Sequence, residues 1–242
     1  MEDSESQLKS VHLVCPNQCG DLQWNKTELK CVKCSSSFPI IDGMAMLFND
    51  ELKSKYHLSK NTVQAYYRDA TKIYDFTSKH AVSGEGAGSF LEELEQKLRP
   101  YFSKDSSALE IGSGTGFCTG IISKLAGSTT ISDASLEMLG VNHRKHPGFA
   151  AICCPIENLP FAEGTFDRIF GNNTFYLVPD KDKGAQQIGK ILKKGGRLIL
   201  SEVNPLNPLW PLRFVLAKHW FESVGVYQLF PWQMKKRFEN AG

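Results

Sequence analysis

The sequence lacks the long apolar run and the one-sided charge that would indicate a membrane span or a polyanion-binding surface. No stretch approaches the ~20 consecutive apolar residues that a transmembrane helix needs. There are 28 Lys and Arg against 26 Asp and Glu, and the net charge of +2 gives no strong indication of nucleic acid or anionic lipid. The first ten residues are acidic and polar, unlike a signal peptide, and are expected to form a disordered tail. These absences predict a cytoplasmic protein without a membrane span.

The cysteines are unevenly placed along a chain of ordinary composition. A length of 242 residues with 41% hydrophobic residues fits one α/β domain with a small appendage. In a reducing compartment, the seven cysteines are better explained as metal ligands and free thiols than as disulfides. Four of them form two close pairs, Cys15 with Cys19 and Cys31 with Cys34. Two such pairs present four thiolates to one tetrahedral ion, the arrangement of a zinc ribbon.

This spacing predicts a structural Zn²⁺ in a ribbon over residues 11–48, followed by a linker over residues 49–60. Four protein ligands leave no coordination position open for a substrate. Iron is an alternative occupant, and four unrelated free cysteines are the alternative explanation. The stretch from Leu13 to Leu47 resembles the zinc-ribbon module related to the small activator subunit of tRNA methyltransferases, although its first cysteine pair is one residue wider.

A glycine-rich run, LEIGSGTGF at residues 109–117, is the other strong motif. Its apolar residues predict the end of a buried strand, and apolar residues at helical spacing follow it. Glycines at every second position let the backbone turn sharply and approach a ligand. This is the geometry of the first βα turn in nucleotide-binding α/β folds. The third glycine comes one residue earlier than in the dinucleotide fingerprint, and a carboxylate, Glu110, stands two residues before the first.

The pattern E-x-G-x-G-x-G resembles motif I of the class I S-adenosylmethionine-dependent methyltransferases of type 11. Further motifs of that family follow in order, so the resemblance covers the chain from about Tyr66 onward. It implies a doubly wound, Rossmann-like α/β sheet over residues 61–242 with S-adenosylmethionine as cofactor. In the family, the glycine loop lies against the methionine and ribose of the cofactor, and the acidic residue helps to hold its amino group. The matching residues are Glu110, Gly112, Ser113, Gly114, Gly116 and Phe117.

A second acidic residue, Asp133, follows the second predicted strand, residues 128–132. A βαβ fold brings the end of that strand beside the glycine loop, where a carboxylate can bind ribose hydroxyls. The alternative role is a helix N-cap without a ligand. Ala134 opens a stretch that resembles the family's D-x-S-x-x-M-L, and the resemblance places it at the same cofactor site.

The adenine end departs from the family pattern. The family carries there an acidic residue that binds the adenine amino group, whereas this chain has Pro155, which offers neither a carboxylate nor an N–H. Ile156 can still donate its backbone N–H and pack on the ring. Glu157, two residues later, is a candidate replacement for the missing carboxylate. Weaker or differently arranged cofactor binding is therefore expected.

Two further residues are placed near the cofactor by the resemblance. Tyr74 belongs to an aromatic, helical segment over residues 61–76 that resembles a lid over the cofactor, and the alternative is that these aromatics are core. Asn172 follows the fourth predicted strand, which faces the transferable methyl group, and the alternative is a loop residue that caps the next helix. No catalytic residue can be assigned. Three histidines are candidate bases by residue type only: His80, His143 and His146.

Methyl transfer to a small-molecule substrate is the favoured function, because the Asn/Asp-Pro-Pro-aromatic signature of nucleic-acid amino-methylating enzymes is absent. An RNA methyltransferase is the first alternative, since some rRNA methyltransferases also pair a zinc ribbon with this fold. Against it, residues 11–48 hold three lysines and three acidic residues. A catalytically degenerate binding or scaffold protein is the second alternative.

The end of the chain carries two further expectations. Residues 204–232, rich in proline and tryptophan, are expected to cover a substrate. The family's last hairpin does not follow, and we expect it to be truncated. The oligomeric state stays open.

Overall fold

The computed structural model describes residues 2–25, 27–49, 51–52, 86–202, 206 and 230–241. Three expectations lie outside this part of the chain: the lid segment with Tyr74, the linker from residue 53 onward, and most of residues 204–232. Within the described part, no helix is both long and apolar enough to cross a membrane.

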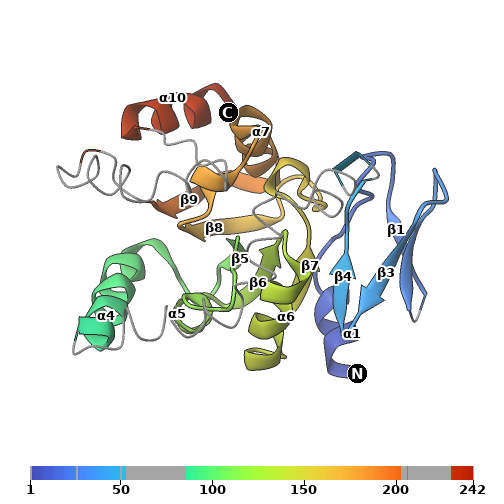
Figure 1. Ribbon diagram of the computed structural model, residues 1–242, viewed down its shortest axis with the longest axis horizontal. Coiled ribbons are helices and arrows are strands. Elements are labelled where there is room, and N and C mark those ends of the chain that lie inside the picture. The colour runs from blue at the N-terminus through green and yellow to red at the C-terminus, as the bar shows by residue number, and fades with distance from the viewer. Residues whose placement is uncertain are drawn as a thin grey trace, which may run out of the picture.

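Among the described residues, nine strands form one sheet in the order β1-β2-β3-β4-β7-β6-β5-β8-β9 (Figure 1). Neighbouring strands are antiparallel from β1 to β4 and parallel from β4 to β9. The strands are β1 (Leu22–Asn25), β2 (Glu28–Cys31), β3 (Ser37–Ile41), β4 (Met44–Met46), β5 (Ser107–Ile111), β6 (Ser128–Asp133), β7 (Ala150–Cys153), β8 (Phe166–Asn172) and β9 (Leu192–Ser201).

Helices cover both faces of the parallel strands, as a doubly wound fold requires. Figure 1 shows α4, α5 and α6 on one side of the sheet and α7 and α10 on the other. The α-helices are α1 (Glu2–Lys9), α4 (Gly86–Leu98), α5 (Thr119–Leu125), α6 (Leu136–Lys145), α7 (Lys181–Ile191) and α10 (Pro231–Ala241). The described residues also form three short 3₁₀ helices: η1 (Arg99–Tyr101), η2 (Ile156–Asn158) and η3 (Phe175–Leu177).

The central strand β5 divides the core between these two helical layers. Successive side chains of a strand point to opposite faces of its sheet. Leu109 and Ile111 accordingly join the cluster that includes α7, whereas Ala108 joins the cluster of α4 and α5. Glu110 lies on the same face as Ala108 and meets α5. An almost entirely buried strand therefore carries one carboxylate into the core.

The chain order places a crevice beside β5. The chain runs from β5 to β6 and β7 on one side and then crosses to β8 on the other. Connections that leave in opposite directions open a gap at the carboxyl ends of the two central strands, and this is where ligands bind in such folds. The fold confirms the expected Rossmann-like sheet and puts its ligand crevice next to the glycine-rich run.

The ribbon continues the sheet directly. Strand β4 pairs in parallel with β7, with Ala45 opposite Ile152, and Leu47 N–H donates to the Cys153 carbonyl at 2.9 Å. Leu52, inside the segment expected to be a linker, is 3% exposed and packs with the α6-side core. The ribbon and the parallel strands therefore share one sheet and one continuous core.

The expectation of a disordered tail over residues 1–10 is wrong. Residues Glu2–Lys9 form the helix α1, and Leu8 is 1% exposed within the same cluster as Leu109. Burial of a leucine side chain contributes roughly 1.5–3 kcal/mol toward holding this short helix against the domain. The expectation rested on the polar composition of residues 1–10 and did not consider the burial of Leu8.

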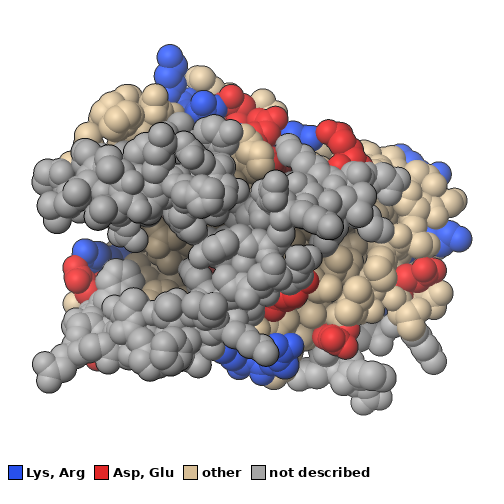
Figure 2. Space-filling view, viewed as in Figure 1, with Lys and Arg blue, Asp and Glu red and all other residues tan. Residues whose placement is uncertain are grey.

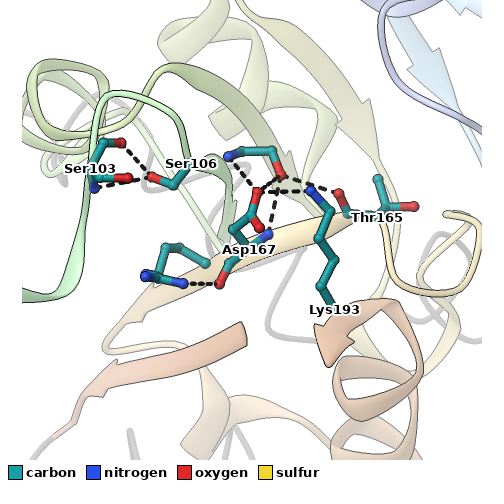
Figure 3. Close-up of polar contacts among 7 residues, drawn as sticks. Ser103, Ser106, Thr165, Asp167 and Lys193 are labelled. Carbon is teal, nitrogen blue, oxygen red and sulfur yellow. Dashed lines mark hydrogen bonds and ion pairs between the residues drawn. The ribbon is translucent and has the colours of Figure 1, made fainter. Parts of the chain in front are cut away.

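A network of polar side chains ties the starts of the central strands together (Figure 3). The Asp167 carboxylate on β8 accepts the backbone N–H of Ser107 at 2.9 Å and its hydroxyl at 2.7 Å. Lys193 on β9 donates to the same oxygen at 2.9 Å. Burial alone would raise the pKa of Asp167, but the hydrogen bonds from Lys193 and Ser107 outweigh it and lower the pKa to about 2. This network joins β5, β8 and β9 at the edge of the sheet opposite the crevice.

Replacing Asp167 with Asn should destabilise the fold by roughly 1–2 kcal/mol, because an amide accepts these hydrogen bonds without the charge. The lowered pKa adds a pH signature. Stabilisation by Asp167 is complete above the ordinary carboxyl pKa and is lost as pH falls toward 2, so the variant should lose its deficit in acid. Urea unfolding from pH 7 down to pH 2.5 measures both effects. Glu163→Gln is the control, since that exposed side chain pairs with Lys190 only at 3.8 Å. Equal stability of the two variants at pH 7 would contradict the prediction.

Candidate functional site

A cleft of about 920 Å³, part of it open to solvent, lies at the carboxyl ends of β5, β6 and β8. Ten of the predicted cofactor residues line it: Glu110, Gly112, Ser113, Gly114, Phe117, Asp133, Ala134, Ile156, Glu157 and Asn172. The fold thus brings together residues spread over more than sixty positions of the sequence.

The glycine loop needs its glycines for two different reasons. Gly112, Gly114 and Gly116 all have positive φ, at 58°, 52° and 90°, where a side chain would strain the backbone. A Cβ on Gly112 would stand 1.8 Å from the Thr174 hydroxyl, so this glycine admits the neighbouring β8 turn. A Cβ on Gly116 would instead stand 2.5 Å from Asn142 Oδ1. Gly116 does not line the cleft, and the residue nearest to a Cβ at this position belongs to α6.

Asp133 holds the glycine loop through its carboxylate. Oδ2 accepts the N–H of Gly114 and Oδ1 accepts the N–H of Ser135, both at 2.8 Å. The N-cap of α6 is Ser135, whose hydroxyl accepts the N–H of Met138, so the alternative role of Asp133 as helix N-cap is wrong. Burial raises the pKa of Asp133, and the backbone hydrogen bonds counter part of that shift.

Glu110 lies deeper in the same cleft and is 2% exposed. Its Oε2 accepts the hydroxyl of Thr119, at the start of α5, at 2.6 Å. Burial raises the pKa of Glu110 from its ordinary 4.5 to about 8, and the nearby charge of Asp133 adds to the rise. An amino cation in this position would favour the ionised carboxylate and reverse part of the shift.

The segment after β7 forms the opposite wall of the cleft. Ile156 and Glu157 stand in η2, and both side chains are almost fully buried. The segment rests on the ribbon: Asn158 donates its amide Nδ2–H to the carbonyl of Pro16 at 2.9 Å, between two buried residues. Val14 N–H donates to the Pro160 carbonyl at 3.0 Å. Residues 14–16 of the cysteine-rich ribbon thus support the wall that follows Pro155.

The turn after β8 closes the third side. Asn172, Asn173 and Thr174 line the cleft, and Asn173 has a φ of 49°. Glu202, just beyond β9, accepts the backbone N–H groups of Phe175 at 2.8 Å and Thr174 at 3.2 Å. The sequence predicted Asn172 but gave no sign that Glu202 fixes this turn.

Four cysteine thiols converge at the tip of the ribbon. The sulfurs of Cys15, Cys19, Cys31 and Cys34 all lie within 4.8 Å of one another. The shorter separations are 3.4 to 3.7 Å, close to the ~3.8 Å that a tetrahedron with 2.3 Å zinc–sulfur bonds requires. Backbone N–H groups two residues after Cys15 and Cys31 point at those sulfurs at 3.4 Å, which orients the ligands. This donor set fits zinc.

The three candidate histidines and Tyr74 lie outside the cleft or outside the described residues. His143 and His146 do not line the cleft, and His80 and Tyr74 lie outside the described residues. His143 is 7% exposed in α6, and His146 stacks on Phe149, so neither matches the candidate role of base. The lining residues that the sequence did not single out are Thr115, Cys118, Ser135, Met138, Cys154, Thr174, Leu177 and Val178. Their only signal is proximity in sequence to a motif residue.

Comparison with known proteins agrees with this geometry. Residues 109–200 match the family model of a methyltransferase domain. The chain is 25% identical over 183 residues to 2-methyl-6-phytyl-1,4-hydroquinone methyltransferase 2 of Oryza sativa, covering 73% of this chain and 50% of that one. It is 32% identical over 134 residues to the ubiquinone/menaquinone biosynthesis C-methyltransferase UbiE of Klebsiella pneumoniae, covering 50% and 53%. The chain spans about half the length of these curated relatives.

Solved structures share the fold at low sequence identity. A possible histamine N-methyltransferase from Thermotoga maritima aligns with a TM-score of 0.60 at 20% identity, covering 74% of this chain and 80% of that one. The complex of the Haloferax volcanii Trm112 methyltransferase activator with a putative methyltransferase aligns with a TM-score of 0.57 at 16% identity, covering 74% and 75%. The fold is that of S-adenosylmethionine-dependent methyltransferases, and the matched family domain begins at β5 and ends in β9.

The Glu110→Gln variant should flatten the pH dependence of stability. Between about pH 4.5 and 8, folded Glu110 keeps a proton that the unfolded chain has lost, so the free energy of unfolding falls as pH rises across this window. Glutamine can still accept the Thr119 hydroxyl and does not titrate. Urea unfolding at pH 5, 6, 7 and 8 should show a smaller decline for the variant than for the wild type, with Glu163→Gln parallel to wild type. Parallel curves for all three proteins would refute the buried titration.

Proposed function

We propose that this protein transfers the methyl group of S-adenosylmethionine to a small-molecule acceptor. One observation carries the proposal: the glycine loop, Glu110 and Asp133 converge on a cleft at the topological switch point of the sheet. The match of residues 109–200 to a methyltransferase domain supports the same cofactor.

The lining residues suggest how the cofactor lies. Gly112, Ser113 and Gly114 would face its methionine and ribose portions, with Glu110 toward the amino group. Asp133 retains lone pairs for the ribose hydroxyls beyond its two backbone hydrogen bonds. The remaining proposed contacts are Ala134 and Phe117 beside the loop, Ile156 and Glu157 at adenine, and Asn172 near the methyl group.

The chemistry asks mainly for alignment. The bound sulfonium supplies an activated methyl group, and the chain has to hold the acceptor in line with it and exclude competing water. Asn172, Asn173 and Thr174 present neutral polar groups at the β8 end of the cleft. No described lining residue is a histidine, so an acceptor that must lose a proton would need a base from elsewhere or be acidic itself.

A small-molecule acceptor is favoured over RNA. Figure 2 shows basic and acidic side chains of the described residues interspersed on one face. The ribbon is balanced in charge, and RNA binding depends on clustered cations. The two curated relatives carry the names of small-molecule methyltransferases, which supports the same class of acceptor here.

Calorimetry with S-adenosylmethionine tests the cofactor directly. The wild type should bind it, and Asp133→Ala should weaken binding about 10- to 100-fold, since a charged acceptor of the loop and of the ribose is removed. Asp105→Asn, an exposed carboxylate before β5, is the control and should bind like wild type. No heat of binding to wild type would reject the cofactor, and an unchanged Kd in Asp133→Ala would remove Asp133 from the site.

We also propose that the four cysteines hold one structural Zn²⁺. Ribbons of this size depend on their metal to fold. Metal analysis should give about one zinc per chain, and Cys34→Ala should lose it, whereas Lys30→Ala on the exposed side of β2 should keep it. Because Pro16 anchors Asn158 beside the cleft, zinc removal should lower both the Tm and the affinity for S-adenosylmethionine. Much less than one zinc in the wild type would refute the metal site.

A further inference from the structure

A buried chain of hydrogen bonds runs from α6 to the cleft. Asn142 Nδ2 donates to the hydroxyl of Thr119 at 2.9 Å, and that hydroxyl donates to Glu110 Oε2 at 2.6 Å. Asn142 and Thr119 are both 0% exposed. These two residues come from different helices and neither belongs to a recognised motif. Fully buried polar side chains are costly unless they make such hydrogen bonds, so the arrangement requires an explanation beyond packing.

The donors and acceptors in this series of hydrogen bonds run in one direction, from Asn142 to Glu110. Thr119 has one hydroxyl hydrogen, and because its oxygen accepts from the Asn142 amide, the hydrogen is directed to Glu110. Oε2 of Glu110 is thereby held by a donor inside the protein. The other oxygen, Oε1, takes no hydrogen bond from the described residues, and Glu110 lines the cleft. One oxygen is anchored and the other is left for a ligand.

The glycine loop leaves space for Asn142, the first residue of this series of hydrogen bonds. Asn142 Oδ1 has no hydrogen-bond partner among the described residues, and it lies 2.5 Å from the place where a Cβ of residue 116 would stand. Lys145, one turn further along α6, donates to the Thr115 carbonyl at 2.8 Å. The third glycine of the motif, predicted as a cofactor contact, thus brings α6 close enough for Asn142 to reach Thr119.

We propose that Thr119 and Asn142 are positioning residues that orient the Glu110 carboxylate to bind the amino cation of the cofactor's methionine portion. The inference rests on the proposed function. It assigns the recognition of the amino acid end to a three-residue unit that spans β5, α5 and α6. An ionised Glu110 faces burial and the charge of Asp133, and the Thr119 hydroxyl is the donor that offsets part of that cost.

Two ligands distinguish the positioning role of Thr119 and Asn142 from a general contribution of these residues to packing. S-Adenosylhomocysteine carries the amino acid portion, whereas 5′-methylthioadenosine has the same adenosine and thioether without it. Thr119→Val removes the hydroxyl at nearly constant volume. Calorimetry should show that Thr119→Val weakens the binding of S-adenosylhomocysteine about tenfold and the binding of 5′-methylthioadenosine less than about twofold. Thr119→Ser retains the donor and should restore the wild-type ratio of the two affinities.

Asn142→Asp tests the direction of the hydrogen bonds. An ionised carboxylate in place of the amide accepts the Thr119 hydroxyl and draws it away from Glu110, so the variant, measured at a pH high enough to ionise this buried carboxyl, should show the same selective loss as Thr119→Val. Thermal unfolding of each variant checks that the fold persists. Equal losses for both ligands, or no loss in either variant, would overturn the proposal. Failure of wild type to bind either ligand would instead reject the cofactor assignment itself.

Discussion

Two buried carboxylates that line the same crevice govern the site. Glu110 and Asp133 both line the cleft, burial raises the pKa of each, and the charge of Asp133 further raises that of Glu110. The described lining residues include no lysine or arginine to relieve them. Such an arrangement lowers stability as pH rises, and a cationic ligand would return that stability on binding. The acidic pair therefore makes sense as a site built for a positively charged small molecule.

The continuous sheet explains how the ribbon relates to this site. Strand β4 pairs with β7, and residues 14–16 hold the segment that leads from Pro160 back to Asn158. The wall that carries Ile156 and Glu157 is therefore bounded by the cysteine knuckle on one side and by the parallel strands on the other. At Pro155 the sequence departs from the family's adenine motif. The segment that follows Pro155 is held by residues 14–16, which lie outside the matched methyltransferase domain. The four-cysteine ribbon and this wall of the cleft are therefore in direct contact.

The sequence predicted what depends on local pattern. Glycine spacing located the loop, the resemblance to the family's first motif identified Glu110, and the order of strands placed Asp133 beside the loop. It could not predict the β4–β7 pairing or the burial of Leu8, because both depend on contacts between residues more than a hundred positions apart. Gly116 shows the limit most clearly. Its spacing identified it as part of the motif, but only the packing of α6 reveals that its neighbour is Asn142.

The distribution of charge along the cleft bears on the chemistry. Acidic lining residues lie in β5, in β6 and in η2, whereas the β8 end presents Asn172, Asn173 and Thr174. Glu202 is close to that end, and its Oε1 accepts the backbone N–H groups of Thr174 and Phe175. On the proposed placement, the sulfonium faces this neutral end. A carboxylate there would stabilise the positive sulfur before reaction more than in the transition state, where the charge is leaving it, and would slow the transfer. Acidic groups confined to the amino acid, ribose and adenine ends hold the cofactor without that cost.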